Sequence, residues 1–214
     1  RCMAGRGAAI RAALSRVAAQ SGSLTIVDAT IEDCVGRDSG AVHTSGVDLV
    51  VNGTAFTGCR AGVSGGAVRA DGNGKVAVTA GVFKSNDAGG AGGAFAAFGG
   101  SVTVSQTRFE GNSAGQSGGA VAAESVASLV LQGVVMTLNS AKDAGGAVAV
   151  LGGGSVTDTG VDPRVDVLGS TISNNTAARG GAIAEVCDPG STLPASVAPP
   201  PPPVGDEQDA VNFD

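Results

Sequence analysis

The chain repeats itself every 26 or 27 residues, and this period constrains its fold more than any other feature. In each repeat an Asn or Cys follows a bulky apolar residue by three positions, and a Gly-Ala pair follows seven or eight positions later. The alanines of these pairs are Ala41, Ala67, Ala94, Ala120, Ala147 and Ala182. The steps between them are 26, 27, 26, 27 and 35 residues, and an insertion around residues 152–163 explains the last. Such a period indicates a solenoid of stacked turns.

A pair of aliphatic residues precedes each bulky residue by seven and five positions. These pairs are Leu24 and Ile26, Leu49 and Val51, Val76 and Val78, Val102 and Val104, Leu129 and Leu131, and Val165 and Val167. The residue between the two members varies freely: Thr25, Val50, Ala77, Thr103, Val130 and Asp166. Alternation with a period of two predicts a strand with one buried face and one open face.

We therefore predict an all-β fold, a right-handed parallel β-helix of about six to seven turns with three parallel strands in each turn. Neighbouring turns would lie about 4.8 Å apart, so the rod would be roughly 30 Å long. The β-helix would cover residues 1–187, and residues 188–214 would form an irregular proline-rich tail. Residues 8–20 have a helix as the alternative, although residues 7–12 align with the repeat at residues 65–70.

Each column of the repeat has a predicted physical role. Aromatic residues should stack along the axis, which buries apolar area: Phe56, Phe83 and Phe109. The asparagine column should lie at sharp turns, adopt left-handed backbone conformations and form an amide ladder: Asn86, Asn112, Asn139 and Asn175. The paired glycines allow close approach with positive φ before the next strand. In that strand Val68 should face inward, whereas Ala67 and Arg69 should face outward.

The alternating tetrapeptides resemble a known family. The first motif occurs as Gly65-Gly66-Ala67-Val68, Gly92-Gly93-Ala94-Phe95, Gly118-Gly119-Ala120-Val121, Gly145-Gly146-Ala147-Val148 and Gly180-Gly181-Ala182-Ile183. The second occurs as Phe83-x-x-Asn86 and Phe109-x-x-Asn112. Together they resemble the repeats of the chlamydial polymorphic outer membrane proteins over residues 1–187. The resemblance implies a parallel β-helix in a secreted or surface-displayed protein that serves adhesion or assembly. Unlike that family, this chain has Cys in place of Asn in the early turns.

The tail contains five consecutive prolines, Pro199–Pro203, which favour extended polyproline II and cannot add a strand to a sheet. One interpretation is a stiff spacer. The other is a resemblance, since a Ser-x-x-Pro run in a chain rich in Gly and Ala is similar to hydroxyproline-rich extracellular glycoproteins of green algae. That class includes cell-wall proteins and the mastigonemes of flagella.

Three cysteines fall in the Asn column on successive turns, so their Cα atoms should lie roughly 5 Å apart, within disulfide range. We predict a bond between Cys34 and Cys59, with Cys2 and Cys34 as the second choice; Cys187 lies several turns away. A disulfide would indicate an oxidising compartment. A zinc site is not expected, because no pair has Cys-x-x-Cys spacing and His43, predicted to be a surface residue, is the one histidine.

Two N-glycosylation sequons occur, Asn52-Gly53-Thr54 and Asn174-Asn175-Thr176. Asn174 precedes the inward Asn175 and should therefore face solvent, so we expect a glycan there if the protein is secreted.

Composition argues against several classes of function. The net charge is −6 with thinly spread basic residues, which disfavours nucleic acid as a partner. No apolar run approaches the length that crosses a membrane. Catalysis is not expected either, because carboxylates are scattered and the outward column of the main strand holds only Asp166. The acidic residues around the insertion suggest a solvated loop, with calcium as the alternative. No cofactor is expected.

Small outward side chains in the last strand of each turn suggest a lateral assembly face. Its members would be Ala67, Ala94, Ala96, Ala120, Ala122, Ala147 and Ala149. We therefore predict a fragment of a longer protein, an extracellular structural or adhesive module of a surface or filament-forming glycoprotein. It would pack against other protein chains, either copies of itself or a proline-rich glycoprotein. The alternative is a polysaccharide lyase or hydrolase on the same fold with its active site outside this fragment.

Overall fold

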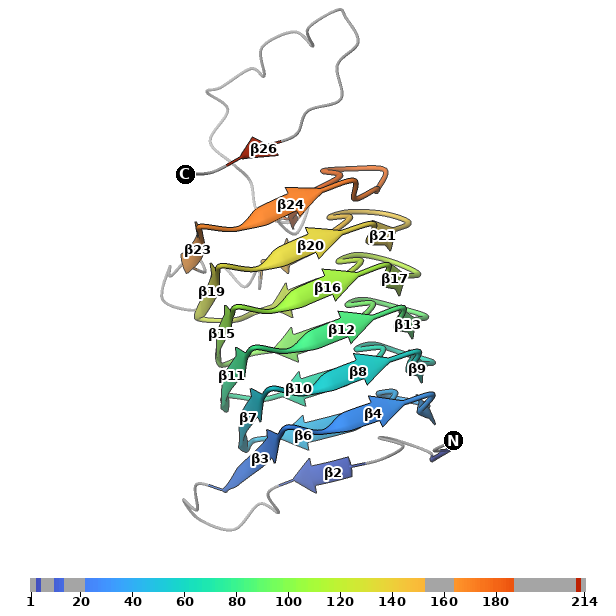
Figure 1. The fold of residues 1–214 in the computed structure, drawn as a ribbon, viewed down its shortest axis with the longest axis vertical. Coiled ribbons are helices and arrows are strands. Elements are labelled where there is room, and N and C mark those ends of the chain that lie inside the picture. Colours follow the sequence, from blue (N-terminus) through green and yellow to red (C-terminus); the bar gives the residue numbers. More distant parts are fainter. Residues whose placement is uncertain (1–2, 5–9, 14–21, 153–163, 187–210, 213–214) are drawn as a thin grey trace, which may run out of the picture.

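The computed structural model describes residues 3–4, 10–13, 22–152, 164–186 and 211–212. Within these residues the chain forms strands and turns and contains no helix. The strands stack into four sheets, here named A to D, and each turn passes through them in the order C, D, A and B (Figure 1). The two terminal cysteines, the insertion at residues 153–163 and the proline run lie outside the described residues.

The four sheets are built from equivalent strands of successive turns. Sheet C contains β3 (Ser23–Val27), β7 (Asp48–Asn52), β11 (Lys75–Thr79), β15 (Ser101–Ser105), β19 (Ser128–Gln132) and β23 (Arg164–Leu168). Sheet D contains β4 (Thr30–Glu32), β8 (Ala55–Thr57), β12 (Val82–Lys84), β16 (Arg108–Glu110), β20 (Val135–Thr137), β24 (Thr171–Ser173) and the antiparallel β26 (Val211–Asn212). Sheet A contains β1 (Met3–Ala4), β5 (Val35–Gly36), β9 (Arg60–Ala61), β13 (Asp87–Ala88), β17 (Ser113–Ala114) and β21 (Ser140–Ala141). Sheet B contains β2 (Ile10–Ala13), β6 (Val42–Ser45), β10 (Val68–Asp71), β14 (Phe95–Phe98), β18 (Val121–Glu124), β22 (Val148–Leu151) and β25 (Ile183–Val186).

The predicted fold class is confirmed. In Figure 1 the chain runs from left to right along the front strands, returns behind them and climbs at each pass, which makes the coil right-handed. The six strands of sheet C mark about five steps between described turns, whereas six to seven turns were expected over the whole of residues 1–187. The expected three strands per turn is wrong. There are four, because the two residues after the Asn column pair as sheet A.

The N-terminal part of the repeat is a strand, because β2 pairs in parallel with β6. Its described residues, Ile10–Ala13, are therefore not helical, which decides against the helical alternative there.

The core is a stack of identical layers. The aliphatic pairs of β7 to β19 in sheet C point inward, and Leu49, Val104 and Leu129 are fully buried, whereas Val165 in the last strand is 36% exposed. In sheet B, Val68 and its predicted counterparts are buried, except Ile183 in the last turn, which is partly buried. The rings of Phe56, Phe83 and Phe109 are stacked, with centroids 4.9 Å apart at each step and interplanar angles of 13° and 9°. This confirms the predicted aromatic column and fixes the register of the turns.

The sharp corner after sheet D differs from the prediction in one detail. The residue with left-handed backbone is the one before the asparagine column: φ is 53° at Ser85, 58° at Leu138 and 55° at Asn174. Glycines occupy the same position in other turns. The asparagines themselves are therefore free to point their side chains inward, where the ladder forms.

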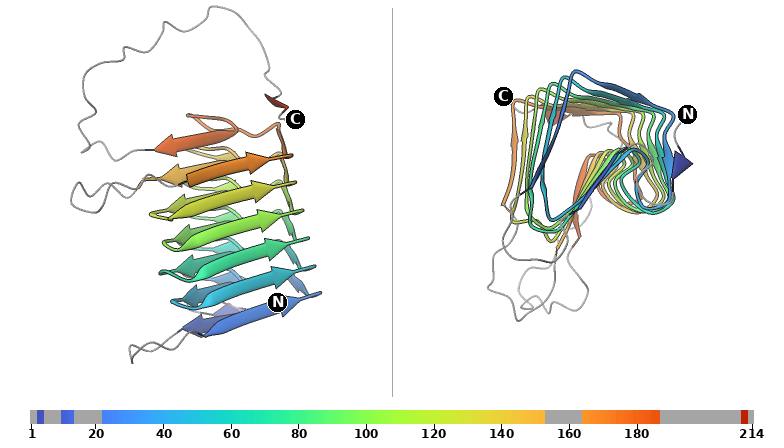
Figure 2. Two further views of the ribbon diagram at one scale, coloured as in Figure 1. Left: turned by 90° about the vertical axis from the view of Figure 1, so that its left-hand side faces the viewer. Right: turned by 90° about the horizontal axis from the view of Figure 1, so that it is seen from below.

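The loops between sheets A and B explain the paired glycines. The first glycine of each pair has positive φ, for example 67° at Gly92. The second has no room for a side chain, since a Cβ on Gly93 would overlap the carbonyl of Gly119 and the backbone of Ser113 in sheet A. We call these loops the A–B loops; they comprise residues 37–41, 62–67, 89–94, 115–120, 142–147 and 177–182. Seen along the axis, they give every turn the same indented outline (Figure 2).

Candidate functional site

The asparagine column is a buried hydrogen-bond ladder, as predicted. The Asn112 side-chain amide donates to the carbonyl of Phe83 (3.0 Å) and to Asn139 Oδ1 (2.9 Å). Asn112 Oδ1 in turn accepts the backbone and side-chain N–H groups of Asn86, both at 3.0 Å. The same pattern continues from Asn139 to Asn175. Every polar atom of these side chains is used between turns, so the column holds the fold together and offers nothing to a ligand.

A second polar column, which sequence analysis missed, lies at the corner between sheets C and D. Its hydroxyls come from alternate turns: Thr54, Thr107 and Ser170. Thr107 Oγ1 accepts the amide N–H of Gly81 (3.2 Å) and donates to the carbonyl of Ser105 (2.8 Å). The signal in the sequence is a Ser or Thr two residues after the end of every second strand of sheet C.

The predicted assembly face is not a surface. The seven alanines assigned to it are between 0% and 2% exposed within a single chain: Ala67, Ala94, Ala96, Ala120, Ala122, Ala147 and Ala149. The A–B loop folds back over this column, so that a Cβ on Gly92 would lie 2.9 Å from the Cβ of Ala96. Ala67 and its equivalents belong to the hydrophobic core instead. Small side chains are needed there because the loop leaves no space.

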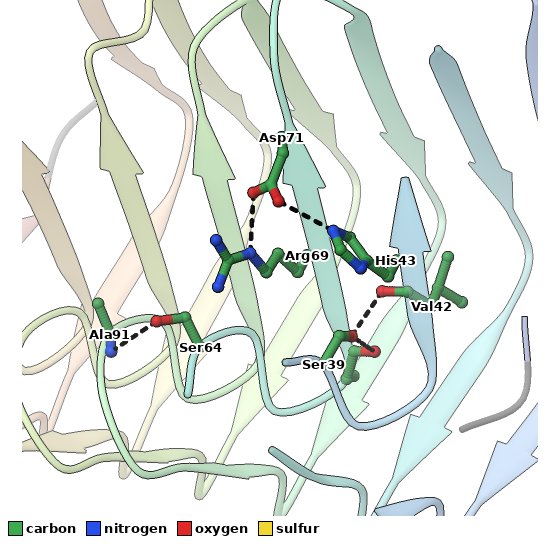
Figure 3. A network of polar contacts seen from close by, with 8 residues as sticks. Ser39, Val42, His43, Ser64, Arg69, Asp71 and Ala91 are labelled. Carbon is green, nitrogen blue, oxygen red and sulfur yellow. Dashed lines mark hydrogen bonds and ion pairs between the residues drawn. The ribbon is translucent and has the colours of Figure 1, made fainter. Parts of the chain in front are cut away.

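In the first turns the same outward column of sheet B carries polar residues. His43 pairs with Arg69 across β6 and β10, and Asp71 lies two residues further along β10. His43 Nε2 is 2.9 Å from Asp71 Oδ2, and Arg69 Nε donates to Asp71 Oδ1 at 2.8 Å (Figure 3). The Arg69 guanidinium lies over the ring of Phe98, 4.5 Å from its centroid. This is a cation–π contact that fixes the guanidinium plane.

The expectation that His43 lies on the surface is wrong, because its residue is only 7% exposed. Burial acts to raise the pKa of Asp71, but hydrogen bonds from His43 and Arg69 and their positive charge outweigh it and lower the pKa. The carboxylate is therefore ionised at neutral pH and holds both partners.

The chemistry open to this cluster is limited. His43 Nδ1 is buried and has no hydrogen-bond partner. The hydroxyl of Ser39, four residues earlier, is fully buried and donates to the carbonyls of Val42 (2.6 Å) and Ala67 (3.3 Å). Within the described parts of the chain no three His, Cys, Asp or Glu residues gather as metal ligands. We interpret the cluster as a structural one that links β6 to β10.

The outer face of sheet C is the most regular open surface. Its central outward column is exposed or half-buried throughout: Thr25, Val50, Ala77, Thr103, Val130 and Asp166. Five of these six side chains are short and uncharged, and a neighbouring column adds the contact between the hydroxyls of Thr79 and Ser105 (3.1 Å). Because the strands pair in register about 4.8 Å apart, the side chains form regular rows on a flat face.

An open hollow of about 530 Å³ lies at the edge of sheet C. It is lined by Ser105, Gln106, Gln132, Gly133, Leu168 and Gly169. The hollow exists because glycines, Gly133 and Gly169, occupy the same corner position in two successive turns. A Cβ added to either glycine would have no other atom within 4 Å. Its lining is uncharged, so it provides no group for acid–base chemistry.

Cys34 and Cys59 occupy the buried Asn column on neighbouring turns, as predicted. The Cys59 thiol lies 3.8 Å from the carbonyl of Ile31, where the asparagines of later turns place an amide. Cys34 Sγ lies 3.5 Å from the carbonyl of Glu32. Bonding of Cys34 to Cys59, or to Cys2, stays a prediction. Peptide mapping of the secreted protein without reductant tests it: a Cys34–Cys59 peptide is expected, and a map with only unlinked peptides contradicts it.

Both sequon asparagines, Asn52 and Asn174, are exposed, which agrees with the expectation for Asn174. Thr176 is also exposed, whereas Thr54 is buried and donates to the carbonyl of Asn52 (3.0 Å). Glycan attachment at either asparagine stays a prediction.

A comparison with known proteins finds no matching family model, curated relative or solved structure. The resemblance to the chlamydial repeats and to the algal glycoproteins therefore rests on the motifs alone. Within the described residues, no helix has both the length and the apolar character needed to cross a membrane.

Proposed function

We propose that the chain is an extracellular structural or adhesive β-helix module of a surface or filament-forming glycoprotein. It acts without catalysis, by packing against other chains along the solenoid, and copies of itself are the partner we test. Support comes from the stacked Phe and Asn columns, which join every turn to the next and give a stiff rod with a constant cross-section.

The observation that carries the proposal is the flat outer face of sheet C. The outward side chains of its central column are short and lie about 4.8 Å apart along the axis, so a second flat face can approach closely over several turns. The alanine face suggested by sequence is buried and has no such role. Association would remove the exposed methyl groups of Val50 and its neighbours from water, which contributes about 25 cal/mol per Å² of apolar area.

Two matched substitutions test this face. Val50 on sheet C and Val82 on sheet D are 39% and 38% exposed, and both are outward residues of inner strands. Val50→Lys places a charge in the proposed contact, whereas Val82→Lys places it on another sheet with the same exposure. We expect Val50→Lys to weaken self-association at least about tenfold, which corresponds to 1.4 kcal/mol, and Val82→Lys to leave it unchanged. Sedimentation velocity over a concentration series measures both.

Self-association that survives Val50→Lys, or that Val82→Lys weakens equally, contradicts the assignment of sheet C. A wild-type protein that stays monomeric at every concentration contradicts packing of copies against one another.

A further inference from the structure

Each sequon asparagine lies beside an exposed aliphatic residue on the preceding turn. Asn52 pairs directly with Val27 in sheet C. Asn174 and Leu138 follow the paired residues Ser173 and Thr137 of sheet D. In both cases the asparagine and the aliphatic residue occupy the same column, with the asparagine one turn further along the rod.

These two neighbours are unusual among the described residues. Val27 is 51% exposed and Leu138 is 62% exposed; of the large hydrophobic residues, only Leu168, at 51%, is also more than half exposed. Single exposed hydrophobic residues need no explanation in general. Here, however, two of the three most exposed occupy the positions next to the two sequon asparagines.

The Leu138 site carries a second peculiarity. Leu138 has a φ of 58°, a left-handed conformation that is strained for a bulky side chain, and Asn174 has nearly the same φ of 55°. Two adjacent residues with the same backbone conformation at one corner project their side chains in the same direction. Strands of neighbouring turns lie about 4.8 Å apart, so a group attached to the Asn174 amide reaches the Leu138 side chain.

We propose that Asn174 carries an N-linked glycan, and that its first sugar covers the Leu138 side chain on the preceding turn. Asn52 has a different setting, because it lies two residues from Val50 on the outward side of sheet C, where a glycan would obstruct the close packing proposed above. This inference rests on the extracellular location in the proposed function. The ligand of Leu138 is thus a covalent part of the same chain, an N-acetylhexosamine whose apolar ring face replaces water on the exposed methyl groups.

The modification is an ordinary group transfer. The side-chain Nδ2 of the asparagine forms a bond to C1 of an oligosaccharide that is carried as a lipid pyrophosphate. The bond between C1 and the pyrophosphate oxygen breaks, the lipid pyrophosphate leaves, and Nδ2 loses one proton.

Site mapping is the first experiment. The protein is secreted from a eukaryotic host, and peptides around residues 52 and 174 are weighed before and after enzymatic glycan release. Thr176→Ala abolishes the second sequon without changing Asn174, and Thr176→Ser keeps it as the matched control. We expect a glycan mass at Asn174 that is lost with Thr176→Ala and kept with Thr176→Ser. Secreted protein with unmodified mass at Asn174 overturns the inference and leaves the proposed function standing.

Thermal unfolding then tests the contact with Leu138. Removing the second glycan with Thr176→Ala should lower the melting temperature by about 2–4 °C, the shift expected for a contact of this size. In the Leu138→Ser background the same removal should change it by less than about 1 °C, the non-additivity expected for two groups in contact. Equal shifts in both backgrounds overturn the proposed contact.

Discussion

Asn112 makes four hydrogen bonds with three other residues and is fully buried, so its loss affects three turns at once. Asn112→Ala would remove the acceptor of the Asn86 backbone N–H and one hydrogen bond each from the Asn86 side-chain amide, the Phe83 carbonyl and Asn139 Oδ1. A buried unsatisfied group costs about 1–3 kcal/mol and each further lost bond about 1 kcal/mol, so we expect a loss of at least about 3 kcal/mol. Asn73→Ala, at an exposed residue, is the control. The midpoints of guanidinium unfolding compare the two, and similar midpoints would contradict the role of the ladder.

Asp71 should make the stability of the first turns depend on pH. Its folded pKa is lowered, so its carboxylate stabilises the fold at pH values above the unfolded pKa of about 3.9. That contribution is lost as the pH falls through the folded pKa. We expect Asp71→Asn to lower the unfolding midpoint at pH 7 and the difference from wild type to shrink progressively below about pH 4. A difference that is constant from pH 7 to pH 3 would contradict this.

Single residues also show what the sequence could predict. The stacking of Phe83 on Phe109 and the bond between Asn86 and Asn112 follow from spacing alone, because one period fixes which residues meet on adjacent turns. The burial of His43 could not be predicted in that way. The side chain of His43 meets non-equivalent positions of the next turn: His43 Nε2 lies 2.9 Å from Asp71 Oδ2, two residues beyond its pairing partner Arg69.

At the scale of the element, the A–B loop depends on the absence of a side chain at one position. A Cβ on Gly93 would overlap fixed backbone of the next turn, whereas a Cβ on Gly133 would meet nothing, although φ there is 59°. Gly133→Ala should therefore cost only the left-handed strain of about 1–2 kcal/mol. We expect Gly93→Ala to cost about 3 kcal/mol or more, because backbone must move. Urea unfolding of both variants measures the difference, and equal costs would show that the loop adapts.

The strands illustrate a related limit of sequence analysis. The five-residue strands of sheet C were predictable because they alternate clearly between aliphatic and variable residues. The strands of sheet A contain two residues each, too few for a period to appear, and they were missed. The assignment of Ala96 to an open face failed because the A–B loop covers its side chain, as the close approach of Gly92 to the Ala96 Cβ shows.

At the scale of the whole molecule, stability should decrease from the middle of the rod toward its last turn. The strands β15 and β23 both have five residues in sheet C, but β15 pairs on both sides, while β23 pairs only with β19 among the described strands. The amides of Val102 and Val104 should therefore exchange hydrogen more slowly than those of Val165 and Val167. Hydrogen–deuterium exchange with peptide resolution measures this. Equal protection would mean that another segment covers the last turn.

The backbone hydrogen bonds between turns, such as that from the Ala94 amide to the Ala120 carbonyl (3.0 Å), run along the length of the rod. Tension applied to the two ends therefore loads successive turns in series, and they come apart singly. A turn occupies about 5 Å of the rod, yet its 26 or 27 residues extend to roughly 90 Å once released. A molecule built in this way absorbs mechanical work one turn at a time. It lengthens many-fold before any covalent bond is strained.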